Sequence, residues 1–251
     1  MAGPKFLMIL SSLPVFAAVF AAFAAVPQIA PAAAPPAVRV ENIRRIFHNG
    51  EHNAFTDLIR WRGKFWLTFR SCPDGHGVVA TSSIIVLASD DTRTWTQVHR
   101  FSVPRRDTRD PHFLAFKGKL FVYTGTWYVG EGVPPREKID FNRHLGYAVW
   151  TADGMAWEGP RHLEGTYGHY IWRAATDGNR ANLCGRRAYV EGRQSVLLES
   201  DDGFIWRYRS AFLEWNGNET AFYIEPDGAL TAICRKTSAA SDLSRSRPPY
   251  K

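Results

Sequence analysis

The sequence has few cysteines, few lysines and no long run of positive charge. Its three cysteines, Cys72, Cys184 and Cys234, lack the C-x-x-C spacing of a metal site, and an odd number cannot close a disulfide framework. It contains 24 arginines but only 7 lysines, and its 31 basic and 24 acidic residues give a net charge of +7. The arginines are scattered, whereas nucleic-acid-binding proteins gather positive charge in runs or on one helix face. We therefore expect no nucleic-acid partner, no metal and no cofactor.

The sequence also lacks any helical pattern. No segment repeats its apolar residues with a 3.6-residue period, and beyond residue 26 no stretch is long and apolar enough to span a membrane. The content of 45% hydrophobic and 22% charged residues excludes a disordered or collagen-like chain. A chain of 251 residues is long enough for one sizeable core or two small ones.

The first 40 residues have the pattern of a targeting segment followed by a linker. Lys5 precedes an uncharged apolar run over residues 6–26, and Ala22-Phe23-Ala24 has the small-x-small pattern of a signal-peptidase site. We therefore expect a signal peptide over residues 1–24, a secreted or periplasmic protein, and no stable membrane insertion after cleavage. An uncleaved membrane anchor is the alternative, because the run is about long enough to cross a bilayer. Residues 25–40, rich in proline and alanine, predict an extended linker.

The rest of the chain repeats one pattern, a β-hairpin followed by a strand and another turn. Runs of β-forming residues flank short turns at Gly63, Gly118, Gly178 and Gly228, which are 55, 60 and 50 residues apart. About four strands in a repeat of this length are typical of a β-propeller blade. We therefore predict an all-β fold, a partial β-propeller over residues 41–251, with blades at about 41–104, 105–165, 166–212 and 213–251.

A Ser/Thr-x-Asp-x-x-x-Trp box follows the hairpin in each of the first three repeats, at residues 89–95, 151–157 and 200–206. In a turn between strands the hydroxyl and carboxylate can bond the local backbone, and the tryptophan can bury a large apolar area. We interpret the boxes as structural rather than catalytic or metal-binding. Their defining residues are Asp91, Trp95, Asp153, Trp157, Asp202 and Trp206.

These boxes resemble the Asp boxes (BNR repeats) of the sialidase (neuraminidase) superfamily, whose general form is Ser-x-Asp-x-Gly-x-Thr-Trp. Other segments resemble bacterial exo-α-sialidase-like proteins, namely residues 52–60, Thr68-Phe69-Arg70, Thr108-Arg109-Asp110-Pro111, Ile171-Trp172-Arg173 and Asn218-Glu219-Thr220. The resemblance covers about residues 45–250 and implies a six-bladed sialidase-like propeller, of which about three and a half blades are present. Because an open ring exposes sheet edges, the resemblance also implies a C-terminally truncated chain or a ring completed by another chain.

Polar residues gather just ahead of the turn glycine in each repeat. The innermost strand of each propeller blade lines the central channel, so the repeat would bring these residues together around one mouth of that channel. Guanidinium groups bind carboxylates, and carboxylates accept hydrogen bonds from sugar hydroxyls, so we expect an anionic, hydroxyl-rich ligand there. The alternative is that the same side chains pair with one another and hold the blades together. The residues are His52, Asn53, Asp57, Arg109, Asp110, Arg173, Asn218 and Glu219.

The resemblance implies sialidase chemistry, in which three arginines bind the substrate carboxylate, an Asp is the acid/base and a Tyr nucleophile is activated by a Glu. Glu219 matches the Glu motif and Arg235 matches one arginine. Phe55-Thr56-Asp57 stands where the first arginine belongs, so Arg70 is the candidate substitute, and the Tyr belongs to later blades. Asp74 is a candidate acid/base or an ordinary Pro-Asp-Gly turn. The expected catalytic residues are Glu219, Asp74 and Asp110, and the expected substrate-binding residues are Arg70, Arg109, Arg173, Arg235, Asn53, Asp57 and His52.

Three functions stay open at this point. The first is an exported glycoside hydrolase of the exo-α-sialidase type, which acts on acidic-sugar glycosides. This hypothesis includes the case in which the truncated chain has lost its activity. The second is a non-catalytic glycan-binding propeller, which the missing arginine and tyrosine favour for the chain as it stands. The third is a scaffold of blades without a ligand. The first two share one expected partner, an acidic glycan.

Overall fold

The computed structural model describes residues 37–133, 135, 138, 140–189, 192–236 and 241–246. The predicted signal peptide and most of the predicted linker lie outside the described residues. The chain divides into one unit that ends at Ile43 and a second that begins at Arg44. In the first unit, residues 37–43 have no regular secondary structure. Within the described ranges, no helix is long and apolar enough to cross a membrane.

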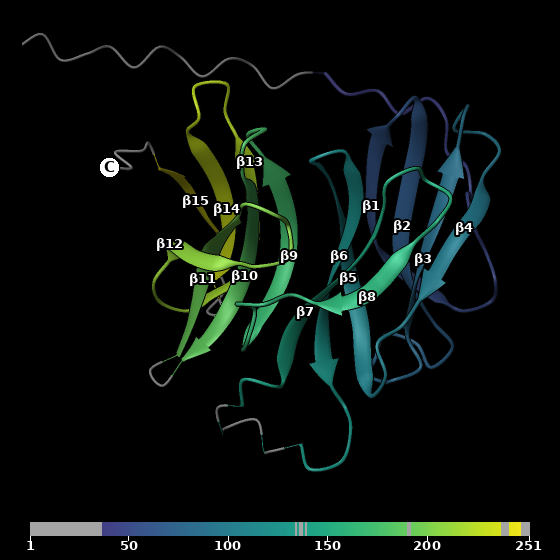
Figure 1. The fold of residues 1–251 in the computed structure, drawn as a ribbon. Coiled ribbons are helices and arrows are strands. Elements are labelled where there is room, and N and C mark those ends of the chain that lie inside the picture. Colours follow the sequence, from purple (N-terminus) through teal and green to yellow (C-terminus); the bar gives the residue numbers. More distant parts are fainter. Residues whose placement is uncertain are drawn as a thin grey trace, which may run out of the picture. The chain divides into compact units, whose positions relative to one another are not determined.

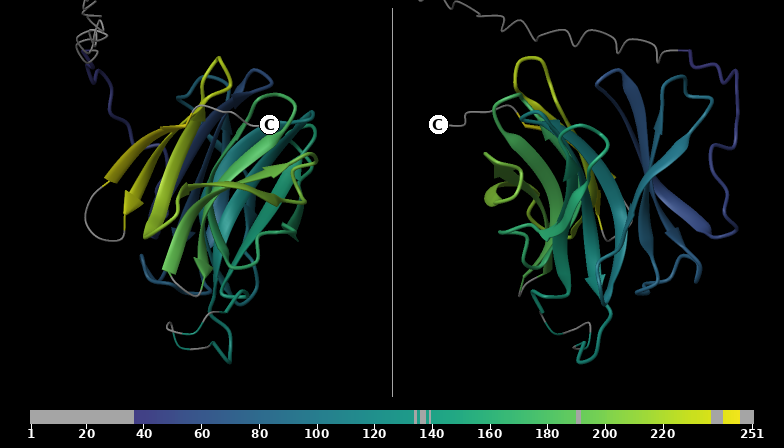
Figure 2. Two further views of the ribbon diagram at one scale, coloured as in Figure 1. Left: turned by 90° about the vertical axis from the view of Figure 1, so that its left-hand side faces the viewer. Right: turned by 45° about the vertical axis from the view of Figure 1, so that its right-hand side comes forward.

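The unit that begins at Arg44 consists of four antiparallel sheets that follow one another along the chain (Figure 1). In Figure 1 they run from the blue sheet on the right to the yellow sheet on the left. Views from two other directions show that each sheet is twisted (Figure 2). The strands are β1 (His52–Trp61), β2 (Lys64–Cys72), β3 (Ser83–Ser89) and β4 (Thr96–Phe101); β5 (Arg106–Phe116), β6 (Lys119–Tyr128), β7 (His144–Thr151) and β8 (Glu158–His162); β9 (His169–Thr176), β10 (Ala181–Tyr189), β11 (Gly192–Ser200) and β12 (Arg207–Leu213); and β13 (Gly217–Ile224), β14 (Leu230–Lys236) and β15 (Ser241–Ser246).

Each sheet is a propeller blade whose strands pair in sequence order. The first strand of each blade lies against the first strand of the next, so that β1, β5, β9 and β13 form an inner row. The first two strands join through tight turns, and at Arg62-Gly63 and Lys117-Gly118 both turn residues have positive φ, as a type I′ turn requires. The predicted all-β propeller fold is confirmed, with three strands of the fourth blade among the described residues.

The three boxes form the same hydrogen-bonded turn between the third and fourth strands of their blades. Asp91 Oδ1 accepts hydrogen bonds from the backbone N–H groups of Arg93 and Thr94, both at 2.8 Å, and the Ser89 hydroxyl accepts one from Thr92 at 2.9 Å. Asp153 and Asp202 make the equivalent bonds in the next two blades. The boxes therefore use their carboxylates to hold the local backbone.

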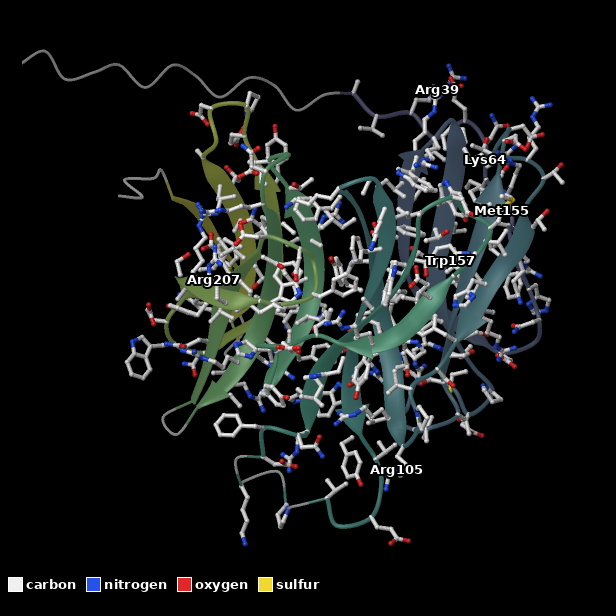
Figure 3. All side chains as sticks on the ribbon, viewed as in Figure 1. Arg39, Lys64, Arg105, Met155, Trp157 and Arg207 are labelled. Carbon is white, nitrogen blue, oxygen red and sulfur yellow. The ribbon has the colours of Figure 1, made fainter. Side chains whose placement is uncertain are left out.

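The second and third boxes also connect their blades to the preceding ones. Trp157 stacks on His99 of β4 with ring centroids 5.1 Å apart, and Figure 3 shows Trp157 beside the sheet of β1–β4. Trp206 packs edge-on against Tyr123 of β6 at 5.6 Å, and the Tyr123 hydroxyl donates to the Gly203 carbonyl at 3.0 Å. To reach the preceding blade in this way, each box must lie one strand after the hairpin of its own blade, as all three boxes do.

Two buried histidines, His144 at the start of β7 and His169 at the start of β9, make stability depend on pH. Burial lowers the pKa of His144 to about 3 and that of His169 to about 4, from an ordinary 6.5. As pH falls, these two histidines are therefore protonated in the unfolded chain before they are protonated in the folded protein. The free energy of unfolding consequently decreases as pH falls from about 6.5 towards 4. Each pH unit in this window should cost up to about 1.4 kcal/mol per histidine.

Urea unfolding of the protein between pH 7 and pH 4.5 measures this effect. His144→Gln removes one titrating ring and should make the free energy of unfolding less dependent on pH. His48→Gln, at an exposed histidine, is the matched control and should leave the dependence unchanged. Equal slopes for all three proteins would contradict the assignment of His144 as a buried neutral ring.

Candidate functional site

Each inner strand contains a β-bulge at the same level, where two of its residues lie opposite one residue of the second strand. Bulges redirect side chains and are common beside active sites. Phe55 and Asp110, in two of these bulges, have φ values of 61° and 52°, which are strained for residues other than glycine. The bulged pairs are residues 55–56, 110–111, 172–173 and 218–219.

One residue of each bulge lines a cavity of about 350 Å3, here named the first cavity. This volume is within the range of small-molecule binding sites. All four blades therefore contribute at least one residue to the wall of the cavity. The bulge residues are Phe55, Asp110, Trp172 and Glu219, and the other lining residues are His76, Arg109, Trp127, Tyr170 and Arg186.

Asp110 is held against the wall of the first cavity by Tyr170, whose hydroxyl donates a hydrogen bond to Asp110 Oδ2. Burial raises the pKa of the Asp110 carboxyl, and this effect exceeds the opposing effect of the Tyr170 hydrogen bond. Burial also raises the pKa of Tyr170 well above its ordinary value, so the phenol stays protonated and serves as a donor. Asp110 is thus an oriented carboxyl group that holds its proton to a higher pH than an exposed aspartate.

Arg186 provides a cation that is enclosed by aromatic rings. Its guanidinium carbon lies 5.7 Å from the Trp127 ring, 5.6 Å from Tyr170 and 5.8 Å from Trp172, and Nη1 donates to the Asn218 side chain at 2.8 Å. Burial lowers its pKa to about 10, so it is charged at neutral pH. Within the described ranges no carboxylate forms an ion pair with Arg186. Glu219 and Asp110 act on its charge from beyond ion-pair distance. A partly dehydrated cation without a carboxylate in direct contact favours an anionic ligand.

Glu219 lines the same cavity from β13 and is much more exposed than Asp110. Its carboxylate forms an ion pair with Arg235 of β14, the residue opposite the bulge, and the two side chains are 50% and 60% exposed. The first cavity therefore holds two carboxyl groups in different environments, one enclosed beside a phenol and one accessible beside a guanidinium.

Arg109 and Arg70 are engaged by the protein itself. Both guanidinium groups bind the fully buried carboxylate of Asp107, and both donate to the carbonyl oxygen of Gly77 at 2.7–2.8 Å. Arg70 is completely buried, so it has no surface for a ligand, while Arg109 reaches the wall of the first cavity. The pair of arginines positions the loop that carries His76.

Arg173 points away from the first cavity. It lines a second cavity of about 340 Å3 together with His112, Trp172, Glu219, Thr220, Ala221, Ile233 and Arg235. Its Nη1 lies 3.7 Å from Asp57, whose carboxylate also accepts the backbone N–H of Phe113 at 2.8 Å. Although burial opposes the shift, His112, the Phe113 amide and Arg173 together lower the pKa of Asp57. Asp57 therefore joins the inner strands of three blades.

The other predicted site residues lie around the rim or outside the first cavity. His52 packs edge-on against His76 with ring centroids 5.2 Å apart, and the Asn53 amide donates to Asn49 at 2.9 Å. Asp74 is exposed, accepts a hydrogen bond from Thr81 at 2.6 Å, and does not line the cavity. Of the predicted residues, the structure brings Arg109, Asp110 and Glu219 to the first cavity, and Arg173, Glu219 and Arg235 to the second.

Sequence reasoning missed most of the aromatic wall and one of the two arginines. Trp127 and Arg186 belong to the second strands of their blades, where neither lies in a segment that resembles the sialidase pattern. Tyr170 directly precedes the Ile171-Trp172-Arg173 segment but carried no signal of its own. Among the described residues, no group of three or more His, Cys, Asp or Glu side chains is arranged to hold a metal ion.

The sequence matches no protein-family model and no curated protein. Its structure is similar to Zg3597, a family 117 glycoside hydrolase of the marine bacterium Zobellia galactanivorans, with a TM-score of 0.57 and 14% identity over 83% of this chain and 70% of that one. It is also similar to the Hadza microbial sialidase Hz136, with a TM-score of 0.64 and 16% identity over 78% of this chain and 44% of that one.

A third similar structure is the Trypanosoma rangeli sialidase in complex with sialic acid. The TM-score is 0.61 and the identity 15%, over 85% of this chain and 41% of that chain. The chain thus spans less than half the length of both sialidases. At these identities the comparisons establish the fold: the chain has the sialidase-like β-propeller fold that the Asp-box resemblance predicted.

Proposed function

We propose that the protein is a glycoside hydrolase that binds the acidic sugar of its substrate in the first cavity. The observation that carries the proposal is the convergence of two carboxyl groups in contrasting environments and one dehydrated guanidinium on a single aromatic cavity. A carboxyl group whose pKa is raised by burial, with a second and more exposed carboxyl group on the same cavity, is typical of acid–base sites.

Asp110 is the general acid in this proposal. Its enclosed carboxyl holds a proton that the glycosidic oxygen needs as the bond breaks, and the Tyr170 hydroxyl fixes its orientation. Activity should then fall as pH rises through the raised pKa of Asp110, because the acid must be protonated to act. Tyr170 is a positioning residue, since its own hydroxyl is engaged by Asp110.

Glu219 is the second carboxylate, and it acts on the sugar or on the attacking water. It is accessible from the first cavity, and its ion pair with Arg235 orients it. A carboxylate in this place accepts hydrogen bonds from sugar hydroxyls or takes a proton from water. Most glycoside hydrolases use a pair of carboxyl groups, one on each side of the scissile bond.

Arg186 supplies the charge that selects an acidic sugar. Guanidinium binds a carboxylate through two parallel hydrogen bonds, and a partly dehydrated site makes such bonds stronger than they are in water. The rings of Trp127 and Trp172 offer apolar faces for the C–H face of a pyranose. The similarity of the fold to those of two sialidases and a family 117 glycoside hydrolase supports the proposal of a glycoside hydrolase.

A glycan-binding propeller without catalysis is the second candidate function. It is favoured by the burial of Arg70, the candidate for the missing first arginine of the sialidase pattern, which leaves that position without a ligand-binding guanidinium. Release of 4-methylumbelliferone from its sialic acid glycoside tests the two functions. Turnover supports the hydrolase, whereas binding of sialic acid without turnover supports the glycan-binding protein.

We also propose that residues 1–24 direct export of the protein.

Arg186→Met should weaken the binding of sialic acid by about 10–100-fold, because a charge-assisted hydrogen bond contributes roughly 1.5–3 kcal/mol. The affinity for a neutral sugar should change little. Arg187→Met is the matched control, since Arg187 stacks on Tyr208 and bonds Gln194 without lining the first cavity. Isothermal titration of both variants measures the difference, and equal losses for acidic and neutral sugars would contradict the role of Arg186.

A further inference from the structure

A third cavity, of about 550 Å3, lies between the first blade and the box of the second blade. It shares no lining residue with the first or the second cavity. Figure 3 shows two of its lining residues, Lys64 and Met155, at the sheet of β1–β4. The third cavity is therefore separate from the candidate active site, and its volume is within the range of ligand-binding sites.

The corresponding space between the second and third blades is filled by aromatic rings. Phe204 of the third box is 9% exposed, and its ring centroid lies 4.7 Å from that of Trp150 and 5.2 Å from that of Phe121. Lys119 Nζ lies 5.5 Å from the centre of the Phe204 ring, as in a cation–π contact. One ring from the box thus enters the preceding blade and closes this interface.

The third cavity is open because two of these rings are replaced. Ala88 lies opposite Trp66 in the first blade, in the position that Trp150 holds in the second. Met155 holds in the second box the position of Phe204 in the third, and it is 81% exposed. A small residue on one wall and an exposed methionine on the other therefore leave open the space that aromatic rings fill between the next two blades.

The walls of the third cavity suit an aromatic side chain. Trp66 and Lys64 occupy the positions of the ring and the cation that contact Phe204 in the next interface. Lys64 Nζ bonds Asp90 at 2.7 Å and is half-exposed, so it can also lie over a ring. Met155 adds a flexible thioether, which packs well on aromatic rings and is common at binding surfaces. An aromatic ring in this cavity would therefore meet the same kinds of group that enclose Phe204.

We propose that the third cavity is a docking site for a partner polypeptide, which inserts an aromatic side chain between the first blade and the second box. A polypeptide is the occupant because main-chain bonds hold the ring in the next interface. There the Glu164 N–H donates to the Phe204 carbonyl at 3.0 Å, and the Trp206 N–H donates to the Glu164 carbonyl at 2.8 Å. In the third cavity the Thr94 and Thr96 side chains supply hydroxyl groups for such bonds. Aromatic side chains in closely fitting pockets are common anchors of protein–protein contacts.

The probe of this site is N-acetyl-phenylalanine methylamide, and its alanine counterpart is the control compound. The 13C-methyl signal of Met155 reports on the cavity, since the other methionines are Met1 and Met8, and Met155→Leu identifies the signal by its loss. The phenylalanine probe should shift this signal in a saturable manner and bind at least about tenfold more tightly than the alanine compound. Equal affinities, or no shift with either compound, would overturn the proposal.

Toluene distinguishes a polypeptide from a free aromatic compound. It has the ring of the probe without the main chain, so it should bind less tightly than the probe. If toluene binds equally tightly, main-chain groups add nothing, and the proposal of a polypeptide partner is wrong.

Met155→Phe tests the geometry of the site from within the chain. Its ring should enter the third cavity as Phe204 enters the next interface, raise Tm by about 2–4 °C and weaken the binding of the phenylalanine probe at least about tenfold. Ala156→Phe adds the same ring at the next residue of the turn, which does not line the cavity, and should change neither quantity. Saturation-transfer NMR of the probe compares all three proteins. Unchanged binding to Met155→Phe would place the probe elsewhere and contradict the proposal.

Discussion

Asp110→Asn should lower kcat for hydrolysis of a sialic acid glycoside by about 10²–10⁴-fold, the usual contribution of a positioned general acid. The amide has nearly the same shape and still accepts the Tyr170 hydrogen bond, so binding of sialic acid should change little. The limb of the pH–activity profile that falls as pH rises should disappear with the carboxyl group. Initial rates of 4-methylumbelliferone release between pH 4 and pH 9 measure both effects.

Asp74→Asn is the control that separates the two aspartates predicted as catalytic. Asp74 is exposed in its loop and accepts a hydrogen bond from Thr81, outside the first cavity. Its substitution should therefore leave the rate within a few-fold of the unaltered protein. A large loss in Asp74→Asn with a small loss in Asp110→Asn would reverse the assignment of the acid.

Trp206→Ala should lower the free energy of unfolding by about 3–5 kcal/mol. The Trp206 ring is 3% exposed and belongs to the core cluster between the second and third blades, where it packs on Tyr123. Its removal leaves a cavity that the paired strands on both sides cannot close. Chemical denaturation followed by tryptophan fluorescence and circular dichroism measures the loss.

Trp95→Ala is the matched control, because Trp95 occupies the same place in the first box. It is only half-buried and packs on the outer face of the first blade beside Ile46 and Phe47. The expected loss is about 1–2 kcal/mol, in proportion to the smaller apolar area removed. Equal losses at the two positions would show that the boxes stabilise their own turns rather than the packing of adjacent blades.

The strands and turns could be predicted because local chemistry determines them. Arg62-Gly63 and Lys117-Gly118 adopt positive φ, which few residue pairs tolerate, so the glycines mark hairpins in the sequence itself. The boxes carry their hydrogen-bond partners within a few residues of the carboxylate. Since both signals recur in phase, the number and order of strands in each blade followed from the sequence.

The site could be predicted only in part, because its geometry depends on contacts between distant residues. Asp110 lies eight residues before the turn at Gly118, and this place in the repeat was enough to bring it to the inner row. Which cavity a side chain lines depends on the bulge, however: Trp172 lines both cavities, whereas the next residue, Arg173, lines the second but not the first. No local pattern in the sequence reveals a bulge of this kind.

Whether an arginine can bind a ligand depends on the residues that lie next to it in the folded protein, and the sequence alone does not show which residues these are. Arg70 pairs with Asp107, which is 37 residues away on another blade, and this pairing makes a predicted ligand-binding residue a structural one. Arg186 lies on the second strand of its blade, and Trp127 of the preceding blade stacks on it. Tertiary packing therefore decides which of the scattered arginines is available to an anion.

In the proposed function, the first cavity selects an acidic sugar through Arg186. Isothermal titration with sialic acid and with its carboxyl-reduced analogue tests it most directly, because the two sugars differ only in the charged group. We predict that the unaltered protein binds sialic acid at least about tenfold more tightly than the reduced sugar, and that Arg186→Met binds the two alike. Equal affinities in the unaltered protein would contradict the claim.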